Sequence, residues 1–351
     1  MAELLRGHTT LRLGGAAGRW VETTTEAELI DAVTTADQAG EPVLILAGGS
    51  NLVVADAGFA GTVVKVATRG LVSDEWPDAG ATSGASCGGV TVRIAAGEQW
   101  DDIVAEAVEH GWVGVEALAG IPGSVGATPI QNVGAYGQEV SQTIASVRVW
   151  DRKLRGIRTF ANADCGFGYR TSRFKADPGR HIVLEVAFQF RQGTLGAPVR
   201  YAELASRLGV AQGDRAPLRD VREAVLALRA GKGMVLDRDD HDTWSAGSFF
   251  TNPMLTEAQS ADLPEDAPRW PQPDGTLKTS AAWLIERAGF TKGYGNDRVS
   301  LSTKHTLAIT NRGQASTADL IALAREVRDG VLQKFGVRLV NEPVLVGCSL
   351  D

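Results

Sequence analysis

Apolar positions between residues 25 and 66 predict one helix and two buried strands. Thr25, followed three residues later by Glu28, forms a capping box, and apolar residues then recur at helical spacing up to Ala36. Residues 43–47 are a continuous apolar run that predicts a buried strand, and residues 62–66 predict another. We therefore expect the chain to begin with a unit of one helix and several strands.

A glycine-rich loop follows the first buried strand directly. The run GGSN at residues 48–51 precedes the apolar residues 52–54. A Rossmann fingerprint or a P-loop would place its glycines at the start of a long amphipathic helix. Here Asp56, Gly58 and Gly61 interrupt any helical pattern. The loop therefore does not fit the usual nucleotide-binding folds.

Residues 67–213 carry more strand signals than the start of the chain. Residues 90–94 alternate between apolar and polar side chains, and residues 146–150 and 182–190 have the composition of strands. Residues 101–110 predict a helix that ends at Gly111. We expect a sheet-rich unit in this part of the chain.

The segment 120–137 has the most unusual composition in the chain. It holds five glycines together with small hydroxyl residues and few charged ones. One interpretation is a long surface loop, although long loops without secondary structure are uncommon unless they are functional. The other is a backbone that lies flat against a large, partly apolar cofactor, which explains the glycines, the hydroxyls and Ile130 together.

The last third of the chain predicts an α+β unit. Pro217 suits the first position of a helix, and residues 280–288 and 317–335 predict helices that flank a strand at residues 306–310. Residues 337–346 are expected to be extended. The parts that we expect, in a fold of the α+β class, are residues 1–66, 67–213, 214–335 and 336–351.

Charge and hydropathy exclude several classes of protein. The 351 residues carry a formal net charge of −7 without any block rich in Lys and Arg, so a nucleic-acid partner is not expected. No apolar run reaches the roughly 18 residues that a membrane helix needs. The N-terminus lacks the apolar region of a signal peptide. We expect a cytoplasmic protein, without a membrane partner and monomeric.

Cysteine and histidine positions do not indicate a metal site. Cys87, Cys165 and Cys348 lie far apart in sequence, without a C-x-x-C motif or a histidine at ligand spacing. The acidic stretch at residues 237–242 is typical of a solvated loop. We therefore assign no metal ligands.

Six segments, in a fixed order, resemble the bacterial UDP-N-acetylenolpyruvylglucosamine reductases over nearly the whole chain. Each segment alone has little specificity, whereas their order and spacing are specific. The segments are residues 9–15 (TTLRLGG), 48–51 (GGSN), 120–137, 166–172 (GFGYRTS), 245–253 (SAGSFFTNP) and 341–343 (NEP).

This resemblance implies a two-part FAD-binding module of the vanillyl-alcohol-oxidase type, formed by residues 1–66 and 67–213. It also implies a substrate-binding domain at residues 214–335 and a final strand, within residues 336–351, that returns to the active site. Main-chain N–H groups of the first glycine loop would surround the FAD pyrophosphate. The residues expected to contact FAD are Gly48, Gly49, Ser50, Asn51, Leu52, Gly123, Gly126, Ala127, Thr128, Ile130 and Gly134.

The implied activity is the NADPH-dependent reduction of UDP-N-acetylglucosamine enolpyruvate to UDP-N-acetylmuramate, a precursor of the cell-wall peptidoglycan. Hydride addition to the methylene carbon leaves an enolate-like dianion, which needs a fixed cation and a proton donor. We expect Arg170 to be the cation and, by the resemblance, Ser248 to be the donor. Glu342 would lie near the substrate carboxylate or act as an alternative acid. The expected substrate contacts are Tyr169, Tyr201, Lys232 and Asn252; His305 is given no role.

Other interpretations of these residues stay open. Arg170 could belong to a surface salt bridge, Ser248 could be a helix N-cap, and Glu342 could be a surface residue before Pro343. The chain could also be a flavin-dependent oxidase built on the same module, or a binding module without turnover. An oxidase would lack the combination of Arg170, Ser248 and Glu342.

Overall fold

The structure, a computed structural model, describes residues 2–76 and 89–351, and its chain divides into two units. Cys87 lies outside the described residues. We call the unit that contains both chain ends the terminal unit and the other the sheet unit. Each has an apolar core of its own. The terminal unit comprises Met1–Gly18, Gly49–Ala60 and Gly231–Asp351, and the sheet unit comprises Arg19–Gly48 and Gly61–Ala230.

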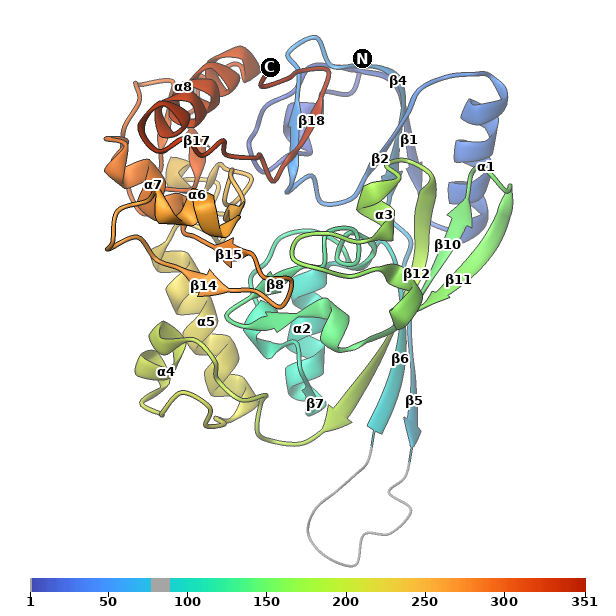
Figure 1. Ribbon diagram of the computed structural model, residues 1–351. Coiled ribbons are helices and arrows are strands. Elements are labelled where there is room, and N and C mark those ends of the chain that lie inside the picture. The colour runs from blue at the N-terminus through green and yellow to red at the C-terminus, as the bar shows by residue number, and fades with distance from the viewer. Residues whose placement is uncertain (1, 77–88) are drawn as a thin grey trace, which may run out of the picture. The chain divides into compact units, whose positions relative to one another are not determined.

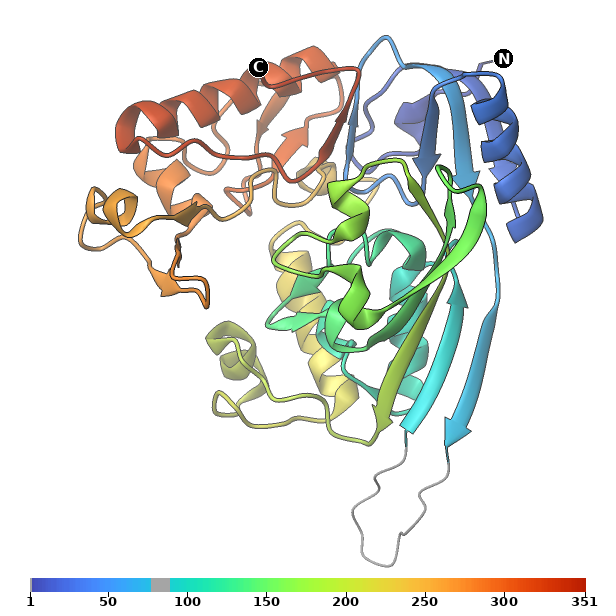
Figure 2. The same ribbon diagram turned by 45° about the vertical axis from the view of Figure 1, so that its right-hand side comes forward.

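A six-stranded sheet forms the centre of the sheet unit, and Figure 2 shows its long strands side by side. All of its pairings are antiparallel. In the strand at Gly89–Ala95, alternate residues are buried, since successive side chains of a strand point to opposite faces of the sheet. The strand order is β11 (Gly156–Ala161), β10 (Ile144–Asp151), β12 (His181–Gln192), β6 (Gly89–Ala95) and β5 (Leu71–Trp76), with β7 (Trp112–Val113) paired to β12.

Among the described residues, this unit contains four α-helices besides the helix at its start, and one of them has a strongly one-sided pattern of burial. In α2 (Trp100–Glu109), the buried residues recur at helical spacing, so one face of the helix packs into the core. The helix confirms the prediction over residues 101–110. The others are α3 (Arg173–Ala176), α4 (Ala202–Leu208) and α5 (Leu218–Gly231).

A smaller three-stranded sheet contains β1 (Ala17–Thr23), β4 (Phe59–Val66) and β2 (Val43–Leu46), in that order. The helix α1 (Glu26–Gln38) precedes β2 (Figure 1). Its capping box is confirmed: the Glu28 N–H donates to Thr25 Oγ1 at 3.2 Å, and the Thr25 N–H donates to the Glu28 carboxylate at 3.1 Å. Strands β2 and β4 are parallel. Most of β4 is buried, but in β2 only Leu46 is, so the strand predicted as buried at residues 43–47 is largely half-buried.

The terminal unit joins segments from both ends of the chain. Strand β18 (Val344–Val346) pairs in parallel with β3 (Leu52–Val54), so that a red and a blue strand lie together in Figure 1. The antiparallel strands β16 (Val299–Leu301) and β17 (Ile309–Asn311) precede the longest helix, α8 (Thr317–Phe335). Smaller elements are β13 (Met254–Leu255), α6 (Glu257–Ala261), β14 (Trp270–Pro271), β15 (Leu277–Lys278) and α7 (Ala281–Arg287).

Two further sequence predictions need correction. The strand predicted at residues 306–310 begins only at Ile309, because the preceding residues form a turn whose main chain is held by side chains. Of the extended stretch at residues 337–346, only Val344–Val346 is a strand. The functional division at residues 66, 213 and 335 stays a prediction, since the two units are defined by contacts alone. Within the described ranges, no helix is long and apolar enough to cross a membrane.

Candidate active site

The N-terminal TTLRLGG segment holds two distant loops of the terminal unit together. The Thr10 N–H donates to the Gly49 carbonyl at 3.2 Å, and Thr10 Oγ1 donates to the Ser245 carbonyl at 2.7 Å. The Asn311 side chain donates to the Leu11 carbonyl at 3.0 Å. This segment therefore links the first glycine loop to the SAGSFFTNP segment.

Ser248 lies in an irregular stretch rather than at the start of a helix. It is half-buried, and the next residue, Phe249, donates its N–H to the Leu307 carbonyl at 2.7 Å. Phe250 then forms an isolated β-bridge with Asn341. Because the next helix begins only at Glu257, the interpretation of Ser248 as a helix N-cap is wrong.

Glu342 comes back to the same place from the end of the chain. Its N–H donates to the Phe249 carbonyl at 2.8 Å, and its own carbonyl accepts from the Asn51 side-chain amide at 3.4 Å. The Val344 N–H donates to the Asn51 carbonyl at 2.9 Å. The structure thus brings Asn51, Glu342 and Phe249, the neighbour of Ser248, together within the terminal unit.

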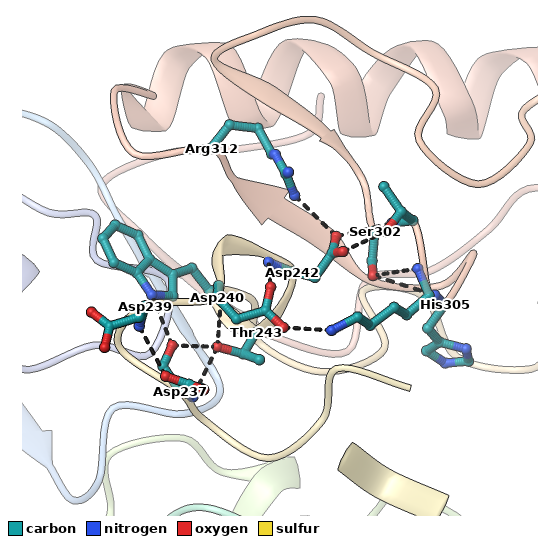
Figure 3. A network of polar contacts seen from close by, with 11 residues as sticks. Asp237, Asp239, Asp240, Asp242, Thr243, Ser302, His305 and Arg312 are labelled. Carbon is teal, nitrogen blue, oxygen red and sulfur yellow. Dashed lines mark hydrogen bonds and ion pairs between the residues drawn. The ribbon is translucent and has the colours of Figure 1, made fainter. Parts of the chain in front are cut away.

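The acidic stretch at residues 237–242 is solvated only in part: residues 237–239 are exposed, as predicted, whereas Asp240 and Asp242 are bonded to the turn before β17 (Figure 3). The buried Asp242 carboxylate accepts from the Thr303 N–H at 2.9 Å, from the Thr303 hydroxyl, and from Arg312 at 2.9 Å. Asp240 accepts from Lys304 Nζ at 2.5 Å. Together these contacts fix the turn before β17, whose Leu307 carbonyl holds Phe249.

The charge of Asp242 is stabilised by these contacts. Burial raises the pKa of its carboxyl, but the hydrogen bonds from Thr303 and the nearby Arg312 guanidinium outweigh burial and lower the pKa below the ordinary value. Among the described residues there is no group of His, Cys, Asp and Glu that could hold a metal ion.

Asn252, His305 and Lys232 also belong to the terminal unit, and each lies in a different local environment. Asn252 Oδ1 accepts from the Ala281 N–H at 3.0 Å and thereby caps the start of α7. The His305 N–H donates to Ser302 Oγ at 3.3 Å. Lys232 is half-buried directly after α5.

In the sheet unit, the 120–137 segment is not a plain surface loop. It contains a 3-10 helix, Val125–Ala127, and the strand β8 (Gly134–Ala135), which pairs with β9 (Gln138–Glu139). The Gly123 carbonyl accepts from the Trp100 N–H at 3.0 Å, and the Gly126 N–H donates to the Ala96 carbonyl at 2.9 Å. The segment is therefore packed along the start of α2.

Several glycines of the two loops are required by contacts within the chain itself. A Cβ on Gly48 would lie 2.6 Å from Gly123 Cα, and one on Gly126 would lie 2.6 Å from Ala96 Cβ. Gly49 has φ +61°, as expected for a glycine turn, and a Cβ there would collide with the His8 carbonyl. The glycine pattern alone is therefore no evidence for a bound ligand.

Ser124, which lies between Gly123 and Gly126, is better evidence for a bound ligand. Its residue is only 2% exposed, and its hydroxyl has no hydrogen-bond partner in the described structure. A buried hydroxyl without a partner is costly, and native proteins rarely retain one without a role. Because Ser124 lies within the segment expected to contact FAD, its hydroxyl fits a cofactor that would accept or donate the missing bond.

Arg170 lies in a tight turn that packs on the same segment. Gly168 and Thr171 exchange main-chain hydrogen bonds, and Arg170 between them has φ +51°, which non-glycine residues rarely adopt. Its half-buried guanidinium donates to the Gly134 carbonyl at 2.8 Å and lies over the Tyr169 ring at 5.8 Å. A strained backbone of this kind often marks a functional position.

Tyr201 lies beside the residues that follow β8. Its side chain is 51% exposed, and its ring meets the Tyr136 ring edge to face at 6.1 Å. Arg229 of α5 interacts electrostatically with Tyr136 and Arg170, and burial lowers the pKa of its guanidinium. Sequence reasoning missed Ser124, Tyr136 and Arg229; of these, Tyr136 could have been found from its place inside the unusual segment.

Comparison with known proteins agrees with this arrangement. The family model of the FAD binding domain matches residues 18–153, and that of the UDP-N-acetylenolpyruvoylglucosamine reductase C-terminal domain matches residues 239–346. The reductase of Streptomyces avermitilis is 58% identical over 97% of this chain and 93% of its own length. That of Thermobifida fusca is 54% identical over 99% and 97%.

A solved structure shows the same fold. The UDP-N-acetylenolpyruvylglucosamine reductase of Thermus caldophilus superposes with a TM-score of 0.66 at 24% identity, covering 99% of this chain and 98% of that one. The expected fold class, α+β with an FAD-binding module, is thereby confirmed. With relatives of this identity and coverage, the chain belongs to the UDP-N-acetylenolpyruvoylglucosamine reductase family.

Proposed function

We propose that this protein is a flavoenzyme that reduces UDP-N-acetylglucosamine enolpyruvate to UDP-N-acetylmuramate, with NADPH as the reductant. One observation carries the proposal beyond family membership. Asn51, Phe249 and Glu342 are joined by hydrogen bonds, although Asn51 and Glu342 are 291 residues apart in sequence. This contact places the candidate acid Glu342 beside the residue that follows Ser248.

The chemistry that bound FAD would supply is the transfer of hydride from NADPH to the substrate. The residues that would hold it are those of the two glycine segments. The unpartnered Ser124 hydroxyl supplies a neutral donor, which suits a phosphate group without adding charge, and Asn51, Gly123 and Gly126 are further proposed contacts. The other proposed contacts are Gly48, Gly49, Ser50, Leu52, Ala127, Thr128, Ile130 and Gly134.

Arg170 would bind the carboxylate of the enolpyruvyl group. After hydride addition, negative charge on the neighbouring carbon can spread only into this carboxylate, so a fixed cation there stabilises the intermediate most. The turn at residues 168–171 and the hydrogen bond to Gly134 hold the guanidinium in one orientation before substrate binds. Its planar donors match a carboxylate in a way that an ammonium group does not.

Ser248 would protonate the carbon of that intermediate. A hydroxyl is a weak acid in water, but an enolate is basic enough to take its proton when water is excluded. The chain around Ser248 is fixed on one side by Thr10 at Ser245 and on the other by Leu307 at Phe249. Glu342 would polarise the substrate carboxylate or serve as a second acid.

The diphosphate of the substrate would be bound by Tyr201, with Tyr169, Lys232 and Asn252 as further contacts. Tyr201 presents an exposed ring whose hydroxyl is a suitable phosphate donor. Asn252 uses its oxygen for the cap of α7, which leaves its amide N–H₂ group for the substrate.

The test is an anaerobic absorbance experiment on the purified yellow protein. NADPH should bleach the flavin, and UDP-N-acetylglucosamine enolpyruvate should restore its colour far faster than air does. Faster reoxidation by air would indicate an oxidase, and a flavin that NADPH does not bleach would indicate a binding module. A colourless chain that FAD does not reconstitute would overturn the proposal.

We also infer that the protein acts as a cytoplasmic monomer, without nucleic-acid or membrane partners. The net charge of −7 supports the absence of nucleic acid. Elution as a single species of 37.1 kDa in size-exclusion chromatography with light scattering would support the monomer, and a dimer mass would contradict it.

A further inference from the structure

Glu116 is a completely buried acidic residue for which the proposed mechanism has no role. Its residue is 0% exposed and belongs to the 3-10 helix Glu116–Leu118 in the sheet unit. Acidic side chains are rarely buried in full unless several donors surround them. The groups that contact Glu116 therefore indicate what it does.

Three separate stretches of chain donate hydrogen bonds to its carboxyl group. Oε2 accepts from the Gly114 N–H at 2.7 Å, and Oε1 accepts from the Ala197 N–H at 2.6 Å and from Gln138 Nε2 at 2.8 Å. Gln138 Oε1 in turn accepts from the Ala117 N–H at 2.8 Å, which fixes the orientation of that amide. The carboxyl oxygens thus accept three hydrogen bonds, from Gly114, Gln138 and Ala197.

One of these stretches leads to Tyr136, and another leads to the exposed Tyr201. Gln138 follows Tyr136 and Gly137, and Ala197 lies four residues before Tyr201. Tyr136 and Tyr201 meet edge to face, and a Cβ on Gly137 would lie only 3.4 Å from the Tyr201 ring. The carboxyl group of Glu116 thus joins the segment that carries Tyr136 to the segment that leads to Tyr201.

We propose that Glu116 is a positioning residue, which sets the place of Tyr201 and thereby the affinity of the protein for the diphosphate of its nucleotide substrate. This inference rests on the proposed role of Tyr201. In Glu116→Gln, one carboxyl oxygen is replaced by an amide N–H₂ that faces N–H donors. Because Oε1 accepts two hydrogen bonds and Oε2 accepts one, the amide oxygen should keep the Oε1 position and the N–H₂ should meet the Gly114 N–H. This repulsion shifts the side chain at position 116, so that its contact with Ala197 is weakened and Tyr201 is held less firmly against Tyr136.

The experiment measures UDP binding to the FAD-loaded full chain by calorimetry, together with KM and kcat for UDP-N-acetylglucosamine enolpyruvate. Glu116→Gln should weaken UDP binding and raise KM by about tenfold, with a smaller change in kcat, since uniform binding is lost. Flavin bleaching by NADPH should be unchanged. Glu109→Gln, at the exposed end of α2, is the matched control and should bind UDP like the wild type.

A double-mutant cycle separates positioning from a general loss of stability. In the Tyr201→Phe background, Glu116→Gln should have little further effect on UDP binding, because the two changes remove one interaction. Gly196→Ala, whose Cβ would lie 2.7 Å from Glu116 Oε1, should reproduce the loss if Glu116→Gln fails to fold. Fully additive effects, or wild-type UDP affinity in both variants, would overturn the inference. UDP binding without turnover would instead overturn the proposed function alone.

Discussion

The main-chain N–H of Glu342 donates a hydrogen bond to the carbonyl of Phe249 at 2.8 Å. This bond joins the NEP segment near the end of the chain to the residue directly after Ser248. A neighbouring β-bridge between Phe250 and Asn341 fixes the same alignment. Both candidate acids of the proposed reaction are therefore positioned by one short main-chain pairing, and changes to either side chain should leave that pairing intact.

Ser248→Ala should separate the two half-reactions. The serine is needed only after hydride has reached the substrate, so bleaching of the flavin by NADPH should stay near the wild-type rate. Reoxidation by the enolpyruvyl nucleotide should slow by about 10² to 10⁴-fold, the usual scale of general acid catalysis. Stopped-flow absorbance at the flavin band measures both steps.

Ser280→Ala is the matched control for this variant. Ser280 is a true N-cap, since its hydroxyl accepts from the Trp283 N–H at 3.2 Å at the start of α7. Its loss should cost about 1 kcal/mol of stability with both half-reactions unchanged. Equal, modest slowing of both half-reactions in Ser248→Ala would contradict the role of Ser248 as the proton donor.

Arg170→Lys should lower turnover by about 100-fold or more while the substrate still binds. Lysine keeps the charge but lacks the planar donor set that fits a carboxylate, and it also gives up the fixed orientation provided by Gly134. Steady-state kcat and the rate of reoxidation measure the effect. Arg173→Lys, three residues on, changes only a stacking contact with Phe160 and should keep normal turnover. Near-normal turnover of Arg170→Lys would assign Arg170 to a structural role.

Local signals in the sequence were sufficient for the longer helices, whereas the short helices α3, α4 and α6 were not predicted. The box of Thr25 and Glu28 and the spacing of apolar residues in α8 are short-range properties, so the bounds follow from nearby residues. Strand β17, which ends at Asn311, starts three residues later than predicted for a different reason. Asp242 holds Thr303 in a turn from 61 residues away, and no periodicity records such a contact.

The candidate site was predictable only in part, and by motif rather than by pattern. Ser248 and Glu342 could be named because their short motifs are specific in combination. Ser124 could not, because an unpartnered hydroxyl becomes visible only when its burial is known. Gly49 shows the opposite case, since its conformation and the nearby His8 carbonyl explain a glycine that the sequence analysis assigned to the cofactor.

Ser124→Ala should weaken FAD binding without harming the apoprotein. Removal of a buried hydroxyl that lacks a partner leaves apoprotein Tm unchanged or slightly raised. If that hydroxyl bonds FAD, its loss should raise the FAD dissociation constant by about tenfold. Fluorescence titration of the apoprotein measures the constant. Thr34→Val, which removes another buried hydroxyl without a partner in α1, should not affect FAD binding. Equal dissociation constants for Ser124→Ala and the wild type would remove Ser124 from the cofactor site.

Asp151→Asn should make the sheet unit less stable at neutral pH and less sensitive to acid. Hydrogen bonds from Arg180 lower the pKa of this fully buried carboxyl to about 2, against an ordinary value of 3.8. Because the unfolded chain binds the proton more readily, this stabilisation is complete above about pH 5 and is lost as pH falls toward 2. The contribution is about 2 kcal/mol at pH 7.

Urea unfolding of the wild type and Asp151→Asn at a series of pH values measures the difference between them. His181, 3.7 Å from Asp151, has a pKa that burial lowers and that the Asp151 charge partly raises again. Its protonation favours unfolding in acid in both proteins, and somewhat more in Asp151→Asn, which lacks that charge. The gap in unfolding free energy should therefore be wide from pH 7 to pH 5 and close between pH 5 and 2. Asp164→Asn, an exposed carboxylate in the same unit, should follow the wild-type curve. A gap that stays constant down to pH 2 would show that Asp151 stabilises the fold through its shape and not through its charge.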